Sequence, residues 1–277
     1  MNELQRTILD IFKEIKSICD KNGIKYFAIG GTCIGAVRHK GFIPWDDDLD
    51  IAIPIEDYDK FFEIARKELR SDYEIYKCEN VRHYHYIFRK IIDSKTTFIE
   101  NSEIRYKDAY KGVYVDVMPI SGIPCGLSER NRFCKKVQLY SRLNVKRRFD
   151  GFGKTAKGKI AWVFLKLINP FIGINYFSDK LYSLLKRYPL AGSELTGYVW
   201  SGNLNKLIFP TKYFEETVEL PFEDTTIKCP KMYHEYLTDQ FGDYMVIPDV
   251  SQRQRHSGIV DLKTPFRVYK EKEILQK

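Results

Sequence analysis

The chain has 277 residues, of which 44% are hydrophobic and 30% charged, with a formal net charge of +8 and a pI near 9.0. This size suffices for one large domain or a core with an appended subdomain, and the lack of repeats and low-complexity tracts argues against a solenoid or a disordered chain. The positive charge suits nucleic acid, an anionic membrane surface or an anionic small substrate as partner, and equally a lysine-rich solvated surface.

The cysteines carry no metal-site or disulfide pattern. They are Cys19, Cys33, Cys78, Cys125, Cys134 and Cys229, with no C-x-x-C pair and no zinc-finger spacing. The N-terminus lacks a charged-then-apolar leader, so we expect no secretion signal. Free thiols in a reducing cytoplasm are the simplest interpretation.

Helices and strands alternate in the first half of the chain. Apolar residues at helical spacing predict an amphipathic helix over 3–21, followed by a strand over 24–29. Gly30 and Gly31 end this strand, and Thr32 is placed to cap a helical turn over 33–39. Further strands are predicted at 46–53, 73–78, 84–92 and 113–118, and further helices at 57–69, 127–149 and 178–187.

The most informative stretch follows the glycine turn and contains four acids within five residues. In an extended chain, Asp46, Asp48 and Asp50 share one face, while Asp47 points the other way. Three like charges on one face repel each other unless a divalent cation neutralises them, and hard oxygen ligands suit Mg²⁺ or Mn²⁺. The sequence therefore predicts a metal site that handles phosphate, beside a turn whose backbone N–H groups suit anions.

Three residues near this stretch are candidates for substrate contact. Arg38 and His39 close the predicted helical turn, where they either complement the helix dipole or, in the case of Arg38, bind phosphate. Trp45 belongs either to the core or to a pocket wall.

A further aspartate lies within a predicted apolar strand. In the stretch 113–118, three valines form one face, and Asp116 lies on the other with Tyr114. A lone acid in such a strand is costly unless it is paired or bound to metal. Asp116 is thus either the carboxylate that meets Asp48 and Asp50 across neighbouring strands or the partner of a lysine or arginine.

Two other stretches leave alternatives open. His83 and His85 alternate with tyrosines, which favours an ordinary strand over a metal site. The stretch 142–168 is basic and then apolar, and is either a buried subdomain helix or an element that contacts an anionic membrane.

These motifs together resemble the LicD family of phosphocholine transferases, which is related to fukutin and fukutin-related protein. The resemblance is carried by Gly30–Gly31–Thr32, by Gly35 to His39, by Ile43 to Asp50 and by Val115 to Pro119, and more loosely by the tail from Phe241 to His256. It implies an α+β protein with a polymerase-beta-like nucleotidyltransferase core, in which a mixed sheet is flanked by helices, and a mainly helical C-terminal subdomain. We place the core at 1–124, the subdomain, with an acceptor- or membrane-binding role, at 125–240, and a segment packing back on the core at 241–277.

The resemblance also implies a reaction and its residues. A phospho-alcohol such as phosphocholine passes from a CDP-linked donor to a hydroxyl of a cell-surface glycan, lipopolysaccharide or teichoic acid precursor, and CMP leaves. The implied metal ligands for Mg²⁺ or Mn²⁺ are Asp46, Asp48, Asp50 and Asp116, with Asp48, Asp50 and Asp116 catalytic and Asp116 as general base. The implied substrate-binding residues are Gly30, Gly31, Thr32, Arg38, His39, Trp45 and His256. The aromatic candidates for a choline pocket are Trp45, Tyr84, Tyr86 and Tyr114.

The expected location is the cytoplasm, at or near the inner face of the cell membrane, with a CDP-alcohol and a lipid-linked saccharide as partners. The zinc-binding cysteine cluster of the fukutin-related type is missing, so we expect no structural zinc. One alternative keeps the fold but moves NMP from an NTP to a small molecule or protein. Another is a basic nucleic-acid-binding protein with a vestigial site, which the complete acid set disfavours because the carboxylates repel phosphates.

Overall fold

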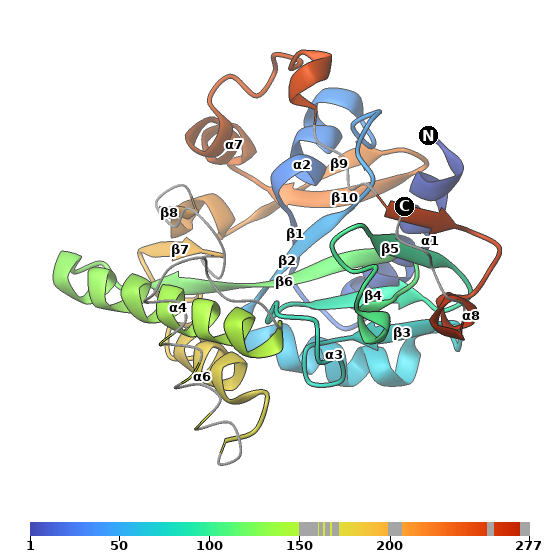
Figure 1. Cartoon of the computed structure of the whole chain (residues 1–277). Coiled ribbons are helices and arrows are strands. Elements are labelled where there is room, and N and C mark those ends of the chain that lie inside the picture. Colours follow the sequence, from blue (N-terminus) through green and yellow to red (C-terminus); the bar gives the residue numbers. More distant parts are fainter. Residues whose placement is uncertain are drawn as a thin grey trace.

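The computed structural model describes residues 1–149, 160, 163, 167, 172–198, 207–253 and 258–271. Within these residues a mixed sheet of seven strands forms the centre of the molecule (Figure 1). Its main path runs β1-β2-β6-β4-β3, made of Phe27–Ala28, Asp50–Pro54, Tyr114–Ile123, Arg89–Asp93 and Tyr73–Tyr76. Strands β2 and β6 are parallel, and the other neighbouring pairs are antiparallel.

Strand β6 is the longest and is buried along its whole length. Its first part pairs with β2 and β4, and its last part pairs with β7 (Leu195–Gly197), which in turn pairs with β8 (Ile208–Pro210). Two smaller antiparallel pairs flank this sheet: β9 (Thr217–Phe222) with β10 (Thr225–Pro230), and β5 (Thr97–Glu100) with β11 (Gly258–Asp261).

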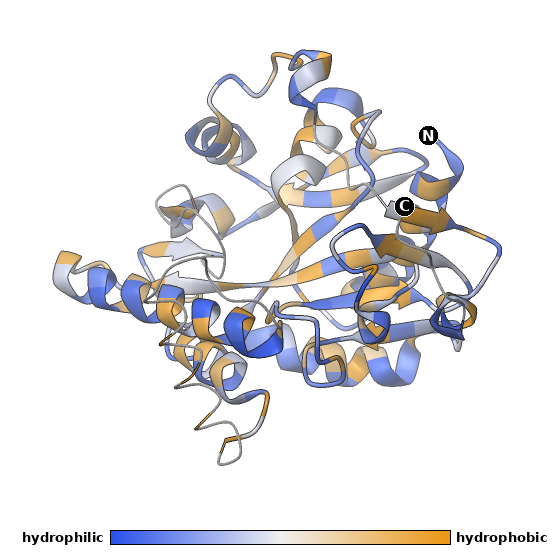
Figure 2. Ribbon diagram, viewed as in Figure 1, coloured by the Kyte–Doolittle hydropathy of each residue, from blue (hydrophilic) through white to orange (hydrophobic). Residues whose placement is uncertain are grey.

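The helices cover the sheet and its ends. α1 (Glu3–Lys21) and α3 (Ile55–Glu68) contact each other and β6, so they lie on the same face. α4 (Leu127–Arg148) and α6 (Tyr176–Leu185) lie side by side, and α7 (Tyr233–Phe241) packs near α2 (Gly30–Ile34), which continues as a π-helical turn over Gly35–His39. The remaining helical elements are α8 (Phe266–Glu271) and short turns at Lys107–Ala109, Thr211–Phe214 and Val250–Gln252. Figure 2 shows the central strands largely in the hydrophobic colour, whereas the outer helices alternate.

The predicted helices are confirmed more closely than the strands. The pattern over 3–21 matches α1, the pattern over 127–149 matches α4, and α3 begins two residues before the predicted 57. The predicted strands 24–29, 46–53 and 84–92 begin late, at Phe27, Asp50 and Arg89. In the last case the aromatic residues Tyr84 and Phe88 pack on each other instead of extending the ladder.

The expectation of a mainly helical subdomain is wrong for the second half of 125–240. This region supplies α4, α6 and α7 but also strands β7 to β10. Strand β6 continues to Ile123, beyond the predicted end at 118, and its far half needs a partner for its backbone groups. β7 provides that partner through Ser121 and Gly197, and so extends the core sheet.

Part of the C-terminal segment 241–277 contacts strand β5 and the turn before it. Among its described residues, Gly258 to Asp261 pair with β5, and the N–H of Phe266 donates to the carbonyl of Thr96 at 2.9 Å.

No helix within the described ranges combines the length and the apolarity needed to cross a bilayer. Of the stretch 142–168, residues 150–159, 161–162, 164–166 and 168 lie outside those ranges. All six cysteines lie inside them and are free thiols.

Candidate active site

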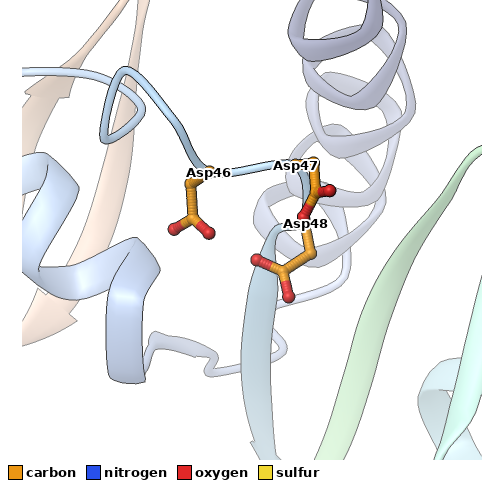
Figure 3. Close-up of side chains that lie close together, drawn as sticks. All are labelled: Asp46, Asp47 and Asp48. Carbon is orange, nitrogen blue, oxygen red and sulfur yellow. The ribbon is translucent and has the colours of Figure 1, made fainter. Parts of the chain in front are cut away.

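Three aspartates of the loop before β2 converge. One carboxylate oxygen each from Asp46, Asp47 and Asp48 lies within 4.8 Å of the others, and all three residues are half-buried. Figure 3 shows their carboxylates hanging to the same side of the loop. Such a set of hard oxygen atoms fits a divalent cation such as Mg²⁺.

One member of this cluster contradicts the prediction from strand alternation. Asp47 was predicted to point away from Asp46 and Asp48, but it joins them. The reason is that β2 begins only at Asp50, so the period of two does not apply to the residues before it.

Behind the loop, three charged residues form a row across adjacent strands. Asp50 of β2 is the register partner of Asp116 of β6, which is in turn the partner of Lys90 of β4. Directly opposed residues share a face of a sheet, so the three side chains lie next to one another. Lys90 Nζ lies 2.6 and 2.9 Å from the two carboxylate oxygens of Asp116. Both roles considered for Asp116 are therefore met: it neighbours Asp50, and it pairs with a lysine.

Burial sets the electrostatics of this row. Burial raises the pKa of the Asp50 carboxyl well above its usual range, and the neighbouring charges of Asp48 and Asp116 raise it further. Burial also raises the pKa of Asp116, against the opposing effect of Lys90. Burial lowers the pKa of the Lys90 ammonium, but Asp116 and Glu100 outweigh it and bring that pKa above its usual value.

One oxygen of Asp50 supports a cation at this place. Its Oδ1 is buried and has no hydrogen-bond partner. A buried, unsatisfied carboxylate oxygen is costly, and an ion held together with Asp46 and Asp48 removes that cost. The residues present therefore fit a divalent cation.

The glycine turn lies directly beside the acids. Gly30 has a φ of +54°, and its N–H donates to the hydroxyl of Tyr236 at 2.9 Å. A Cβ at Gly31 would lie 2.9 Å from Oδ2 of Asp46, so glycine allows this close approach. Thr32 does not cap a helix as predicted, since Ile29 is the N-cap; its hydroxyl accepts from the N–H of Asp50 at 2.8 Å and ties the turn to the start of β2.

A glutamine of α1 holds the other side of the acid loop. Gln5 is buried, and its amide Nε2 donates to the carbonyls of Ile43 at 3.2 Å and Asp46 at 2.9 Å. The two carbonyls bracket the Pro44–Trp45 turn, so one side chain fixes the approach to the carboxylates.

The other predicted substrate residues are engaged with the C-terminal segment. Arg38 Nη1 donates to the carbonyls of Tyr244 at 2.6 Å and Val246 at 3.2 Å, and Arg38 Nε donates to Nε2 of His39 at 3.0 Å. The guanidinium of Arg253 lies 4.1 Å from the centre of the Trp45 ring. Phosphate contact by Arg38 stays a prediction, and His256 lies outside the described residues.

The aromatic candidates for a choline pocket are engaged by other side chains of the protein. Tyr84 is 3% exposed and packs within the core, and the face of Tyr114 carries Lys90 Nζ at 3.5 Å. Trp45 holds Arg253 over its ring, and Tyr86 is half-buried beside Tyr84. Two of the four rings thus already bind cations of the chain itself.

Among the described residues, the two histidines belong to no cluster of three metal-ligating side chains. His83 Nδ1 lies 2.5 Å from Asp108, and the His85 ring lies in tilted contact with Tyr86. Both imidazoles also pack against Phe149, but no strand holds them, because β4 begins only at Arg89.

Lys90, Gln5 and Tyr236 were not identified from the sequence. The sequence does contain a signal for Lys90. This charged residue directly precedes the apolar pair Ile91–Ile92 in a strand, just as Asp116 lies next to apolar residues in its strand. No local signal distinguishes Gln5 or Tyr236, because their contacts join the site to a helix at the start of the chain and to one near its end.

Fold and site together define a class: an α+β protein with a cluster of carboxylates that fits a divalent cation, beside a glycine turn. A family model described as LicD/FKTN/FKRP, nucleotidyltransferase domain, matches residues 23–141, which contain the turn, the acid loop and Asp116. Residues 23–141 therefore form a domain of this family.

Individual relatives agree with this assignment. The chain is 27% identical over 263 residues to the lipopolysaccharide cholinephosphotransferase LicD of Haemophilus influenzae, covering 92% of this chain and 95% of the relative. It is 35% identical over 52 residues to the human ribitol 5-phosphate transferase FKRP, covering 19% of this chain and 10% of that protein. An uncharacterised Rickettsia typhi protein is 42% identical over 69 residues, covering 25% of this chain and 22% of the relative.

Proposed function

We propose that this protein transfers a phospho-alcohol, phosphocholine in the first place, from a CDP-linked donor to a hydroxyl of a cell-surface glycan or its lipid-linked precursor, with release of CMP. The observation that carries the proposal is the convergence of Asp46, Asp47 and Asp48 in the loop that leads into β2, where Asp50 is the register partner of the buried Asp116. The family assignment supports it, as do the names of two relatives, one a cholinephosphotransferase and the other a ribitol 5-phosphate transferase.

The residues divide into cation ligands and a base. We assign Asp46, Asp48 and Asp50 to Mg²⁺, with Mn²⁺ as an alternative, because carboxylate oxygens of Asp46 and Asp48 converge and the buried Oδ1 of Asp50 lacks a hydrogen-bond partner. When bound, the cation offsets the charge of the donor pyrophosphate and stabilises the departing CMP. The small Gly31, next to Asp46, lets the phosphates approach the backbone.

Asp116 serves as the general base. The acceptor oxygen forms a new bond to the phosphorus of the phospho-alcohol, and the hydroxyl proton passes to Asp116. The bond from that phosphorus to the bridging oxygen breaks, and CMP leaves with the electron pair. Positioning and charge stabilisation account for most of the acceleration in reactions of this type.

The acceptor and the cellular location follow from the same proposal. A lipid-linked saccharide or teichoic acid precursor lies at a membrane, and α4 carries the exposed cations Arg132, Lys135, Lys136 and Arg142, which suit the anionic inner face. We propose that the enzyme works there from the cytoplasm and does not act on nucleic acid. Flotation with anionic liposomes, compared with a variant in which these cations are replaced by serine, tests the membrane contact.

The enzymatic test measures CMP release from CDP-choline, with CDP-ethanolamine, CDP-ribitol and CDP-glycerol in parallel. Asp48→Asn and Asp116→Asn should each reduce Mg²⁺-dependent release by about 10²-fold or more, because each removes a charge that acts in the transition state. Asp72→Asn, which removes a surface acid paired with Lys95, is the matched control. Undiminished turnover in both site variants would contradict the mechanism. Stabilisation by NTPs but by no CDP-alcohol in a thermal-shift screen would favour the nucleotidyltransferase alternative.

A further inference from the structure

Lys90 is the one residue of the charged row that the proposed reaction does not use. The row runs Asp50, Asp116, Lys90 across three adjacent strands, so Asp116 has an acid on one side and a cation on the other. Only 4% of Lys90 is exposed, and burying an ammonium group is costly unless it is well paired.

The surroundings of Lys90 hold its ammonium group in one place. Nζ lies within hydrogen-bond distance of both oxygens of Asp116, at 2.6 and 2.9 Å. The same atom lies 3.5 Å from the centre of the Tyr114 ring, which is itself stacked on Phe98. A lysine with its four-carbon stem buried and its charge held by a carboxylate and an aromatic face has little freedom to move aside.

A second buried lysine near Tyr114 provides a comparison, because its ion pairs lie outside the proposed active site. Lys111 is also fully buried, and its Nζ lies 2.5 Å from Glu103 and 3.3 Å from Glu100. It approaches the Tyr114 ring at 5.2 Å. Lys111 therefore neutralises acids outside the row, whereas Lys90 neutralises an acid inside the proposed active site.

The position of Lys90 conflicts with a second divalent cation on Asp116. An ion bound to either oxygen of Asp116 at about 2.1 Å would lie within about 5 Å of Nζ, and the two positive charges would repel each other.

We propose that Lys90 is a positioning residue that takes the place of a second metal ion. It donates to Oδ2 of Asp116 and forms an ion pair at 2.6 Å with Oδ1, which accepts no hydrogen bond. The site then binds a single divalent cation, between the loop acids and Asp50, and Asp116 remains available to the acceptor hydroxyl. This inference rests on the proposed function, since it concerns the same acids.

The experiment counts bound Mn²⁺ on the full-length protein from the loss of the EPR signal of the free ion, a readout that does not depend on turnover. The wild type should bind one Mn²⁺ per chain. Lys90→Met, which keeps the length and apolar character of the stem but removes the charge, should bind two. The double variant Lys90→Met/Asp116→Asn should return to one, and Lys90→Arg, which keeps the charge, should stay at one.

Each outcome decides for or against the proposal. Two Mn²⁺ per chain in the wild type overturns it, and so does an unchanged count in folded Lys90→Met. If circular dichroism shows that Lys90→Met does not fold, Asp116→Asn decides: it should keep one Mn²⁺ with a Kd changed by less than about threefold, and loss of binding overturns the proposal. A wild type that binds no Mn²⁺ overturns the metal site of the proposed function as well, whereas failure of the Lys90 variants alone leaves that function in place.

Discussion

The acids of the loop and the acids of the strands meet at one place but are held in different ways. Asp46, Asp47 and Asp48 lie half-buried on a loop, where solvent still screens their charges. Asp50 and Asp116 lie on neighbouring parallel strands; Asp50 is half-buried but has a buried Oδ1, and the buried Asp116 is paired with Lys90. The first group can adapt to an ion that arrives and leaves, whereas the geometry of the second is set by the register of the sheet.

Aspartates on the loop and aspartates on the strands therefore have opposite effects on the stability of the protein. Like charges on a partly solvated loop destabilise the metal-free protein modestly, and an ion relieves them. A carboxylate paired with a buried ammonium supports the fold, because removal of either partner leaves an uncompensated buried charge. Three sets of variants test this difference between the loop and the strand acids.

The largest effect on stability is expected at Asp116. Asp116→Ala leaves Lys90 buried without its carboxylate and should lower the free energy of unfolding by about 3–5 kcal/mol. Asp47→Ala, the matched change on the loop, should alter it by no more than about 0.5 kcal/mol or raise it slightly. Urea denaturation in EDTA measures both, and equal losses would break the distinction between loop and strand acids.

A smaller effect is expected at Gln5, which joins α1 to the loop. Gln5→Leu leaves the carbonyls of Ile43 and Asp46 without their donor and should cost about 1–3 kcal/mol, while weakening Mn²⁺ binding. Asn2→Ala is the control, since it removes the cap of the same helix, at a cost of about 1 kcal/mol, without touching the loop. Calorimetric Mn²⁺ titration beside thermal melts separates the two, and equal Mn²⁺ affinity in both variants would argue that Gln5 only stabilises the helix.

The smallest effect is expected at Gly31. A methyl group there must displace the Asp46 carboxylate from its position 2.9 Å away, so Gly31→Ala should raise the Kd for Mn²⁺ by about tenfold or less, which corresponds to at most ~1.4 kcal/mol. Gly126→Ala, where the added methyl meets nothing within 4 Å, is the control. An unchanged Kd in Gly31→Ala would mean that Asp46 is not a ligand, and would restrict the site to Asp48 and Asp50.

Much of the fold was predictable because it is locally encoded. The helix over 3–21 carries apolar residues at helical spacing, and the helix over 127–149 was predicted from a run of basic residues; the structure forms both with the predicted bounds to within a residue. The strands were predicted less well, because their ends depend on partners elsewhere in the chain. Strand β6 extends to Ile123 since β7 pairs with its far half, and nothing near residue 120 indicates this.

For the candidate site, the sequence alone identified the acids that the structure brings together. The glycine pair, the aspartates from 46 to 50 and the lone Asp116 were all identified from their patterns, because an acid cluster or an acid in an apolar strand is costly unless it has a function. Only the tertiary structure decided how they are grouped. Asp47 joins the loop cluster, and Lys90 binds Asp116. Gln5 binds the acid loop at Asp46, and Tyr236 binds the glycine turn at Gly30. The physical reason is distance along the chain, since these hydrogen bonds join residues 26, 41 and 206 positions apart, and only strand register and helix docking bring such partners together.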